Sequence, residues 1–408
     1  MNIGVFTDSF RPYSSGVVRS IELFSREYIK RGHSVYTFCP DYPLMDIIEE
    51  KNVFRFKSVP WPTVTDFTLP IPISAYLNQT IERLGIDIIH VHSPFLLGRL
   101  GARAARRHKL PLLFTFHTLY EQYVHYFPFV ENTSKQVVQA IAREFSNRCN
   151  VVVAPSQLVV DYLRQIGIKT RIVKIPTGID MDEFKELDRN WLKKNYGVEP
   201  EEKTLLFVGR LGKEKNVEFL LKSFQDVLKS IPDCRLVLVG KGPLEEHLRQ
   251  LCRQQVIEDK VIFTGELSRQ QIVHCYASSD LFVFPSVSDT QGLVIGEAKA
   301  AGVPVVAIRA FGPAEMVNHC EDGLLTENAL PDFTGAIIKL LKDKELYSRM
   351  RKQSLINAPL ISSALCSERM LEVYRELIED RVYATRVKKP FNKRQITSNE
   401  QNEKVSVL

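Results

Sequence analysis

The sequence has no long apolar run. No stretch of its 408 residues approaches the ~18 to 20 consecutive apolar residues that a membrane-spanning helix needs. The opening segment MNIGVFTDSF places Asp8 where a secretory signal peptide would carry its apolar region. We therefore expect a protein that stays in the cytoplasm.

The cysteines are few, and their spacing shows no pairing pattern. The seven cysteines are odd in number, widely scattered and without any CxxC pair, at positions 39, 149, 234, 252, 275, 320 and 366. This pattern disfavours both a disulfide framework and a zinc site. We expect seven reduced thiols.

A strong charge of one sign is also missing. The net charge is only +6, which is far short of the basic footprint of a nucleic-acid-binding protein. Most of the excess lies in residues 1–185, which carry 22 Lys and Arg against 17 Asp and Glu. Such a bias fits an anionic membrane face or a phosphate ligand, and it fits an ordinary solvated surface equally well.

What the sequence does contain is a strand and helix pattern that occurs twice. The length suits two domains, and a hydrophobic fraction of 44% is typical of a globular protein. Alternating apolar runs and helical patterns predict βαβ units with parallel sheets. The strand-like runs of the first half are IGVFT, SVYTFC, IDIIHVH, LPLLFTFH and VVVAPS, and those of the second half are KTLLFVGR, RLVLVGKG, KVIFTGE, DLFVFPS and VPVVAI. The clearest helical patterns cover 21–31, 97–108, 217–230 and the surroundings of Glu297.

The two domains should meet near residue 190. Periodicity lapses in PTGIDMDEF and over 185–203, where proline, glycine and aspartate cluster. We predict domains at 1–190 and 191–362, followed by a segment 363–385 whose amphipathic helix packs back across them. The polar, aperiodic tail 386–408 is typical of a flexible chain, although its basic start could touch anionic lipid.

Two carboxylates stand eight residues apart in SVSDTQGLVIGE, which runs from Ser286 to Glu297. The segment follows the apolar strand DLFVFP and leads into a helix, with Gly292 in the turn between them. The carboxyl end of a parallel strand is where α/β sheets bind ligands, and the helix that follows offers free N–H groups to phosphate. Carboxylates there can accept hydrogen bonds from sugar hydroxyls.

This segment resembles the E-x7-E signature of family 4 glycosyltransferases, which have the GT-B fold. Asp289 matches the first acidic position and Glu297 the second. The resemblance implies that Glu297 binds the ribose of a nucleotide sugar and that Asp289 holds the transferred sugar. It implies the same sugar contact for the backbone of Thr290, Gln291, Gly292 and Leu293. Aspartate in place of glutamate shortens the reach by one methylene, which bears on donor-sugar identity more than on catalysis.

A second element, VGRLGKEKN, places Arg210 and Lys215 after a buried strand. Two cations on one loop can offset a diphosphate and stabilise the charge that grows on the leaving group. The element resembles the family's GRL-x-x-EKN motif, which implies catalytic roles for both side chains. The alternative is a pair of surface cations bound to Glu214 or Glu218.

Several glycines mark further donor contacts. Gly16 lies between the first strand and helix, where a missing side chain lets the backbone approach phosphate. Its loop is similar to the family's first loop, which implies a contact between Gly16 and the diphosphate. A simple tight turn is the alternative. Gly240, Gly242 and Gly265 occupy places where relatives hold the base and ribose through backbone groups, and ordinary turns are the alternative.

Histidines gather at the ends of two predicted strands. His117 follows the run LPLLFTF at the expected mouth of a cleft. A lone histidine there is commonly structural, but the resemblance implies contact with the donor sugar or its phosphate. His90 and His92, in IIHVHSP, are interpreted as packing or acceptor-side residues, and no spacing among the three requires a metal.

The phrase HTLYEQYVHY, from His117 to Tyr126, resembles the HTMYEDYxHY phrase of bacterial diacylglycerol glucosyltransferases. Tyrosine and histidine at this density offer an amphipathic surface to a lipid glycerol and its hydroxyl. The resemblance implies that Tyr120, Tyr123, His125 and Tyr126 bind the acceptor. An aromatic loop that caps the core is the alternative.

Two features indicate a membrane partner. The apolar, proline-broken segment 59–77 is a poor core helix but suits a flap that touches a bilayer. Arg99, Arg103 and Arg106 recur at helical spacing and should share one face. Each could add about 1 kcal/mol of attraction near anionic lipid, and a solvated basic face is the equal alternative.

The resemblance covers roughly residues 1 to 380. It implies an α/β protein of GT-B architecture, with two Rossmann-like domains whose parallel sheets face an interdomain cleft. Residues 1–190 would face the acceptor and the membrane, and 191–362 would bind the nucleotide sugar. The activity implied is retaining transfer of a hexose, glucose from UDP-glucose, to diacylglycerol at the inner face of the cell membrane. No cofactor or essential divalent metal is expected, because Arg210, Lys215 and amides would meet the leaving diphosphate.

No side chain stands out as a covalent nucleophile, which favours substitution on one face with the leaving phosphate deprotonating the acceptor. Other acceptors, phosphatidylinositol or a soluble sugar, remain open. A UDP-sugar 2-epimerase also has two Rossmann-like domains, but the acidic segment and the tyrosine-rich phrase argue against it. The nearly complete donor site argues against a non-catalytic membrane-binding relative.

Overall fold

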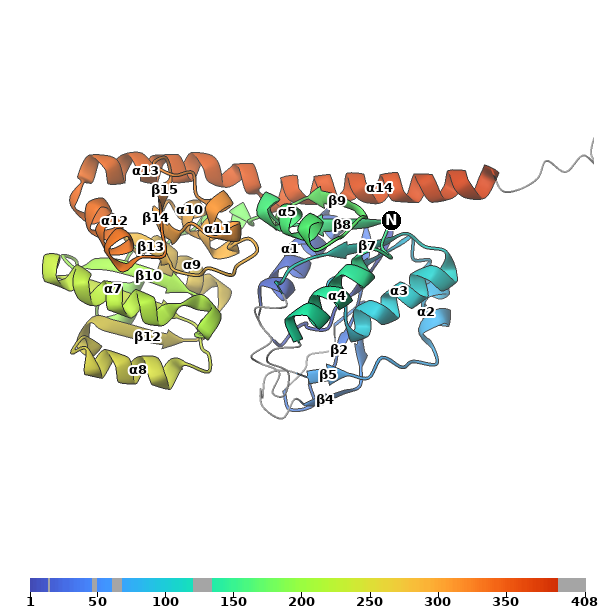
Figure 1. Ribbon diagram of the computed structural model, residues 1–408, viewed down its shortest axis with the longest axis horizontal. Coiled ribbons are helices and arrows are strands. Elements are labelled where there is room, and N and C mark those ends of the chain that lie inside the picture. Colours follow the sequence, from blue (N-terminus) through green and yellow to red (C-terminus); the bar gives the residue numbers. More distant parts are fainter. Residues whose placement is uncertain (14, 46–49, 61–67, 120–133, 388–408) are drawn as a thin grey trace, which may run out of the picture.

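The chain forms two α/β domains that lie side by side in a computed structural model (Figure 1). The structure describes residues 1–13, 15–45, 50–60, 68–119 and 134–387. Among these residues, no helix combines the length and the apolar character needed to cross a bilayer.

The first domain is built on a seven-stranded, wholly parallel sheet of order β3-β2-β1-β6-β7-β8-β9. Its strands are β1 (Asn2–Phe6), β2 (Ser34–Pro40), β3 (Val53–Phe56), β6 (Ile88–Val91), β7 (Leu112–Thr115), β8 (Val151–Ala154) and β9 (Arg171–Lys174). Its helices are α1 (Gly16–Lys30), α2 (Leu77–Leu84), α3 (Leu96–His108), α4 (Ser134–Ser146) and α5 (Gln157–Gln165). Central strands such as β6, β7 and β8 are buried at every residue, as parallel strands covered on both faces must be.

The second domain repeats this plan with six parallel strands in the order β12-β11-β10-β13-β14-β15. The strands are β10 (Lys203–Val208), β11 (Cys234–Val239), β12 (Val261–Gly265), β13 (Leu281–Phe284), β14 (Val305–Ile308) and β15 (Gly323–Thr326). The helices are α6 (Trp191–Tyr196), α7 (Val217–Ser230), α8 (Glu245–Gln254), α9 (Arg269–Ala277), α10 (Leu293–Ala300), α11 (Phe311–Met316), α12 (Leu330–Lys342) and α13 (Lys344–Asn357). Short 3-10 turns lie at Met181–Phe184, Lys213–Lys215, Glu258–Lys260 and Ala358–Ile361. The prediction of two Rossmann-like domains with parallel sheets is confirmed.

Strand order determines where a ligand can bind. In each sheet the domain's first strand lies inside, with β2 and β6 flanking β1, and β11 and β13 flanking β10. The direction of chain travel reverses at these strands, and such a switch point leaves a crevice at the carboxyl ends of the strands. The loops after β1, β6, β10 and β13 therefore carry the candidate site.

Helix α14 (Ser363–Val387), the last in the described part of the chain, crosses from the second domain to the first. Figure 1 shows it continuing from α13 and running along the N-terminal domain. Met370, Leu371 and Tyr374 are fully buried in one core cluster with Ile3 and Tyr28 of the first domain. The N-terminal core is therefore completed by the far end of the chain. Residues 388–408 of the predicted tail lie outside the described part.

An antiparallel hairpin of β4 (Ser58–Pro60) and β5 (Thr68–Pro70) occupies part of the segment expected to touch a bilayer. Residues 61–67 of that segment lie outside the described residues. On the described side, Val59, Ile73 and Tyr76 are 56%, 79% and 72% exposed. These three side chains are displayed to solvent, whereas Leu77 at the end of the segment is buried in the core.

Candidate active site

The turn that links β13 to α10 joins the two domains. Thr290 donates from Oγ1 to the carbonyl of His117 (2.6 Å), and its own carbonyl accepts from Ser156 Oγ (2.8 Å). The side-chain amide of Gln291 accepts from the Thr177 N–H (2.8 Å) and donates to the Thr177 carbonyl (2.7 Å). The signature segment predicted from the sequence therefore lies at the interdomain contact.

Asp289 and Lys215 form the charged pair of this turn. Lys215 Nζ lies 2.7 Å and 2.8 Å from the two carboxylate oxygens of Asp289, and the side chains are only 15% and 19% exposed. Lys215 thus pairs with Asp289, whereas Glu218 lies 3.2 Å from His247. An ammonium carries three N–H donors, so Lys215 can hold this carboxylate and still donate to an anion.

Glu297 is buried at 4% exposure and held from two sides. Arg269 Nη1 lies 2.8 Å from Oε1, and the Tyr276 hydroxyl donates to Oε2 at 3.0 Å. Burial raises the pKa of Tyr276 well above its usual value, which keeps this hydroxyl a donor. Each carboxylate oxygen retains acceptor capacity, so Glu297 can receive a pair of ligand hydroxyls without losing its supports.

Arg269 continues this contact into an ion-pair chain. Its Nε lies 2.7 Å from Glu183, which also receives Arg19 Nη2 at 2.5 Å. Burial alone would raise the pKa of Glu183, but Arg19 and Arg269 hold that pKa below its usual value. The chain from Glu297 through Arg269 and Glu183 to Arg19 links α10 and α9 of the second domain to α1 of the first. The sequence analysis did not identify Arg269, Glu183 or Arg19.

Arg210, which is predicted to meet the diphosphate, makes a further contact across the domains. Arg210 Nη1 donates to the hydroxyl of Tyr13 at 3.2 Å. Nearby, Ser15 caps α1 by accepting from the Val18 N–H, and Gly16 is the helix's first residue. A Cβ on Gly16 would meet nothing within 4 Å, so an anion could reach this helix end.

The other glycines have packing roles of their own. A Cβ on Gly240 would lie 2.2 Å from the Gly209 carbonyl oxygen, and one on Gly242 would lie 2.4 Å from the Leu211 carbonyl oxygen. The Gly240 N–H donates to the carbonyl of Gly265 at 3.0 Å. Glycine is required here because three loops approach one another closely. A donor contact at these positions stays a prediction.

The three strand-end histidines, His90, His92 and His117, form one histidine cluster. His92 Nδ1 lies 2.8 Å from His117 Nε2, and the His90 and His92 rings are 4.2 Å apart. His90 is held by Tyr374 at 2.5 Å and by Thr115 at 2.7 Å. Burial lowers the pKa of His90 and His92 well below the usual value and lowers that of His117 to about 3. All three rings are neutral at neutral pH.

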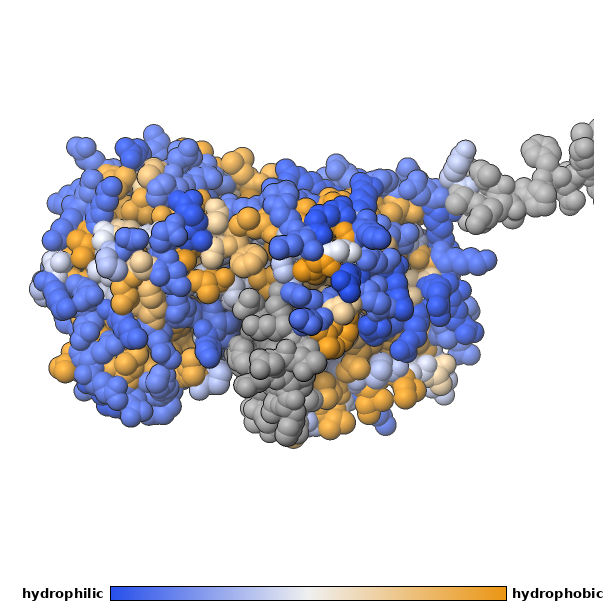
Figure 2. Space-filling view, viewed as in Figure 1, coloured by the Kyte–Doolittle hydropathy of each residue, from blue (hydrophilic) through white to orange (hydrophobic). Residues whose placement is uncertain are grey.

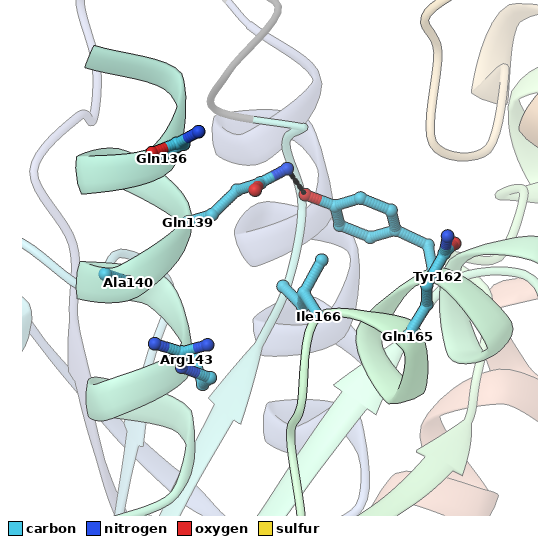
Figure 3. A pocket seen from close by; sticks show the side chains of 7 residues that line it. All are labelled: Gln136, Gln139, Ala140, Arg143, Tyr162, Gln165 and Ile166. Atoms are coloured by element: carbon cyan, nitrogen blue, oxygen red, sulfur yellow. Dashed lines mark hydrogen bonds between the residues drawn. The ribbon is translucent and has the colours of Figure 1, made fainter. Parts of the chain in front are cut away.

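Tyr120, Tyr123, His125 and Tyr126, predicted to bind the acceptor, lie outside the described residues. Where the chain resumes, α4 and α5 border a groove of about 470 Å³ (Figure 3). Its lining is formed by Gln136, Gln139, Ala140, Arg143, Tyr162, Gln165 and Ile166. Gln139 donates to the Tyr162 hydroxyl at 3.3 Å, and the Tyr162 ring contacts Phe116, next to His117. The groove contains none of the predicted site residues.

The first turn of α11 packs against the acidic turn. Gly312 donates its N–H to the Asp289 carbonyl at 3.0 Å, and a Cβ on Gly312 would lie 2.2 Å from the Cα of Gln291. Phe311, which adopts a positive φ of 32°, packs against the core of the other domain. A bulky residue in this conformation is unusual and marks a constrained contact.

The basic face of α3 is only partly free. Arg99 Nη2 lies 2.9 Å from Glu144, whereas Arg103 and Arg106 are exposed. Figure 2 shows hydrophilic and hydrophobic side chains interspersed on one face of both domains.

Within the described ranges, no group of three or more His, Cys, Asp or Glu could hold a metal ion.

Two parallel-sheet domains that meet at the carboxyl ends of their strands, with acidic and basic side chains at the junction, have the architecture of the GT-B class. Two family models match the chain: Glycosyltransferase Family 4 over residues 14–183 and Glycosyl transferases group 1 over residues 188–355. The chain belongs to family 4 of the glycosyltransferases.

Similar proteins include enzymes with different donors and products. An alpha-monoglucosyldiacylglycerol synthase of Streptococcus pneumoniae is 32% identical over 392 residues, which cover 94% of this chain and 85% of that protein. A GDP-mannose-dependent alpha-mannosyltransferase of Corynebacterium glutamicum is 32% identical over 338 residues, 80% of this chain and 77% of that protein. The crystal structure of Anabaena HepE in complex with UDP-glucose matches 92% of this chain and all of its own, with a TM-score of 0.75 at 20% identity.

Proposed function

We propose that the protein transfers glucose from UDP-glucose to diacylglycerol, with retention of anomeric configuration, while bound at the inner face of the cell membrane. The observation that carries this proposal is that two features occur in one chain. Charged residues are arranged as a nucleotide-sugar site requires, and a sequence motif is similar to one in enzymes that glucosylate diacylglycerol. Asp289, paired with Lys215, lies in the interdomain turn, and the supported carboxylate of Glu297 lies on α10, the helix that follows this turn. The phrase from His117 to Tyr126 resembles that of diacylglycerol glucosyltransferases.

The donor would lie along the ends of β10 and β13. Glu297 would accept the two ribose hydroxyls, since both of its oxygens are fixed by neighbours and keep acceptor capacity. Arg210, Lys215 and the open helix end at Gly16 would face the diphosphate. Asp289 and the backbone of Thr290 to Leu293 would bind the hexose. We expect no metal ion to be needed, because these cations and amides balance the diphosphate charge.

The transfer step needs no enzyme nucleophile in this proposal. The bond between the anomeric carbon and the phosphate oxygen breaks, and the acceptor hydroxyl attacks the same face of the sugar. The acceptor's proton moves to an oxygen of the leaving diphosphate. His117 is neutral, so it would act near the sugar as a hydrogen-bonding group and not as a cation.

A lipid acceptor is supported by the surface of the first domain. Ile73 and Tyr76 are exposed and lead directly into α2. His108 of α3 lies 3.1 Å from Asn78 of α2, so the apolar segment adjoins the helix that exposes Arg103 and Arg106. Apolar side chains beside exposed cations suit an anionic bilayer surface. The name of the S. pneumoniae relative, a synthase of a glucosylated diacylglycerol, points to the same acceptor.

A second donor is favoured by one specific observation. The C. glutamicum relative, named as GDP-mannose-dependent, is as similar in identity as the glycolipid synthase. GDP-mannose is therefore the alternative donor, and phosphatidylinositol or a soluble sugar the alternative acceptor.

The test is transfer of radiolabel from UDP-glucose or GDP-mannose into diacylglycerol in mixed micelles that contain anionic lipid. We expect labelled glycolipid from UDP-glucose, with the rate lowered at least tenfold by Glu297→Gln. Glu246→Gln, at a carboxylate whose side chain is 83% exposed, is the matched control and should be fully active. Label from GDP-mannose alone would overturn the donor assignment. Nucleotide release without lipid product, followed by transfer to phosphatidylinositol or a soluble sugar, would overturn the acceptor assignment.

A further inference from the structure

The contact between His92 and His117 constrains a residue that the proposed function places against the donor sugar. His117 Nε2 is engaged by His92 Nδ1 at 2.8 Å, and the two rings are nearly parallel at an 18° interplanar angle. A ring nitrogen already bonded inside the protein is not available to substrate. The nitrogen that His117 can offer a substrate is therefore Nδ1.

Two neutral tautomer pairs satisfy this contact, and they leave different groups on Nδ1 of His117. Each neutral imidazole has one N–H donor and one acceptor nitrogen. If His92 donates from Nδ1, His117 must accept at Nε2 and carry its proton on Nδ1. His117 then presents a donor, which is the group that a sugar hydroxyl oxygen or a phosphate oxygen with growing negative charge requires.

His92 is itself held in place by buried side chains next to it, which together form a histidine layer with His90. Its exposure is 4%, and its ring lies 4.2 Å from that of His90, which is 2% exposed. Both nitrogens of His90 are occupied, Nδ1 by the Tyr374 hydroxyl and Nε2 by the Thr115 hydroxyl. Because Tyr374 belongs to α14, this C-terminal helix supports the histidine layer.

We propose that His92 is the positioning residue of His117: it fixes the orientation of the His117 ring and its Nδ1–H tautomer, so that Nδ1 donates to the donor sugar or its phosphate. This inference rests on the proposed function, in which His117 contacts the donor. It adds a supporting residue that acts through His117 and touches no substrate itself.

The experiment is a double-mutant cycle on the transferase reaction. His92→Phe keeps a ring beside His90 but removes the hydrogen bond to His117, and we expect kcat to fall about 10- to 100-fold. His92→Asn places an amide near the Nδ1 position and should recover most of that loss. His247→Phe, at an exposed histidine of α8, is the matched control and should leave kcat unchanged.

The cycle is completed in the His117→Ala background. If His92 acts through His117, adding His92→Phe to His117→Ala changes kcat less than about twofold, because the group being positioned is absent. Thermal unfolding of each variant separates this effect from a loss of folded protein.

The possible negative results distinguish an error in the positioning role of His92 from an error in the donor contact of His117. If His117→Ala lowers kcat but His92→Phe does not, or lowers it by the same factor in both backgrounds, the positioning role is overturned and the proposed function stands. If His117→Ala retains full activity, the donor contact of His117 fails and the inference fails with it.

Discussion

Replacing Arg269 with methionine removes the central member of the ion-pair chain. Arg269 lies 2.8 Å from Glu297 and 2.7 Å from Glu183, and its side chain is 28% exposed. Methionine keeps much of the volume but leaves two carboxylates without their shared cation. Glu183 retains Arg19, whereas Glu297 keeps only the hydroxyl of Tyr276.

The expected loss of stability follows from the partial burial of Arg269. Removing one partner of a buried ion pair costs about 3–5 kcal/mol, because the charge left behind stays desolvated. Solvent reaches part of Arg269, so we expect roughly 2–3 kcal/mol. One kcal/mol lowers the Tm of a domain of this size by about 2–4 °C, which gives a decrease of roughly 4–12 °C.

Thermal unfolding of the unliganded protein, followed by circular dichroism, measures this decrease. Arg253→Met is the matched control, since Arg253 pairs with Glu246 at 3.2 Å where both side chains are more than half exposed. Exposed pairs contribute about 0–1 kcal/mol, so the control should shift Tm by less than about 4 °C. A decrease no larger than that of the control would refute the reasoning.

A second substitution tests whether the loss of stability comes from the Glu297 carboxylate that is left without its cation. Glu297→Gln in the Arg269→Met background removes the uncompensated charge and should restore part of the Tm. If the two losses simply add, Arg269 and Glu297 do not act as a pair.

Three further predictions concern the site and its surroundings. Lys215→Met should lower transferase kcat at least tenfold, since Asp289 loses two charge-assisted hydrogen bonds worth about 1.5–3 kcal/mol each; unchanged kcat would show that the pair is dispensable. Gly242→Ala should destabilise the protein by about 1–3 kcal/mol in urea unfolding, because the new Cβ meets the Leu211 backbone; Gly335→Ala, where a Cβ meets nothing, should be neutral or stabilising. The histidine cluster should make stability fall as pH drops below about 6.5, because the unfolded chain binds protons that the folded one excludes. The loss is about 1 kcal/mol per histidine between pH 6.5 and 5.5, and equal urea midpoints at both values would contradict it.

Most strands that the sequence predicted lie inside a sheet. Runs such as VVVA and LLFV are buried on both faces, so every residue of the run is apolar. The edge strands β3, β9 and β15 were not predicted. The residues of β3 and β9 are mostly half exposed or exposed, and β15, although buried, is the four-residue run GLLT with only two large apolar side chains. Helix α6 was missed within 185–203, because six residues are too few to show a helical period.

The segments that carry the candidate site could be located in the sequence where their signal is local. The strand, turn and helix that carry Asp289 and Glu297 follow one another in the chain, as do Arg210 and Lys215. The supports of these residues come from distant segments: Arg269 joins Glu183 across 86 positions, and Glu183 joins Arg19 across 164. No periodicity or spacing relates such residues, so sequence patterns could not identify them.

The sequence by itself determined the alternation of buried strands and helices, the glycines at tight turns and the order of the acidic and basic motifs. These depend on neighbouring residues, whose spacing sets which side chains share a face. Only the tertiary structure decided that Lys215 binds Asp289 and not Glu218, that Gln291 holds the other domain, and that Tyr374 braces the histidine layer. Hydrogen bonds and ion pairs act over a few ångströms, so these partners could be known only once the packing of the domains had brought them together.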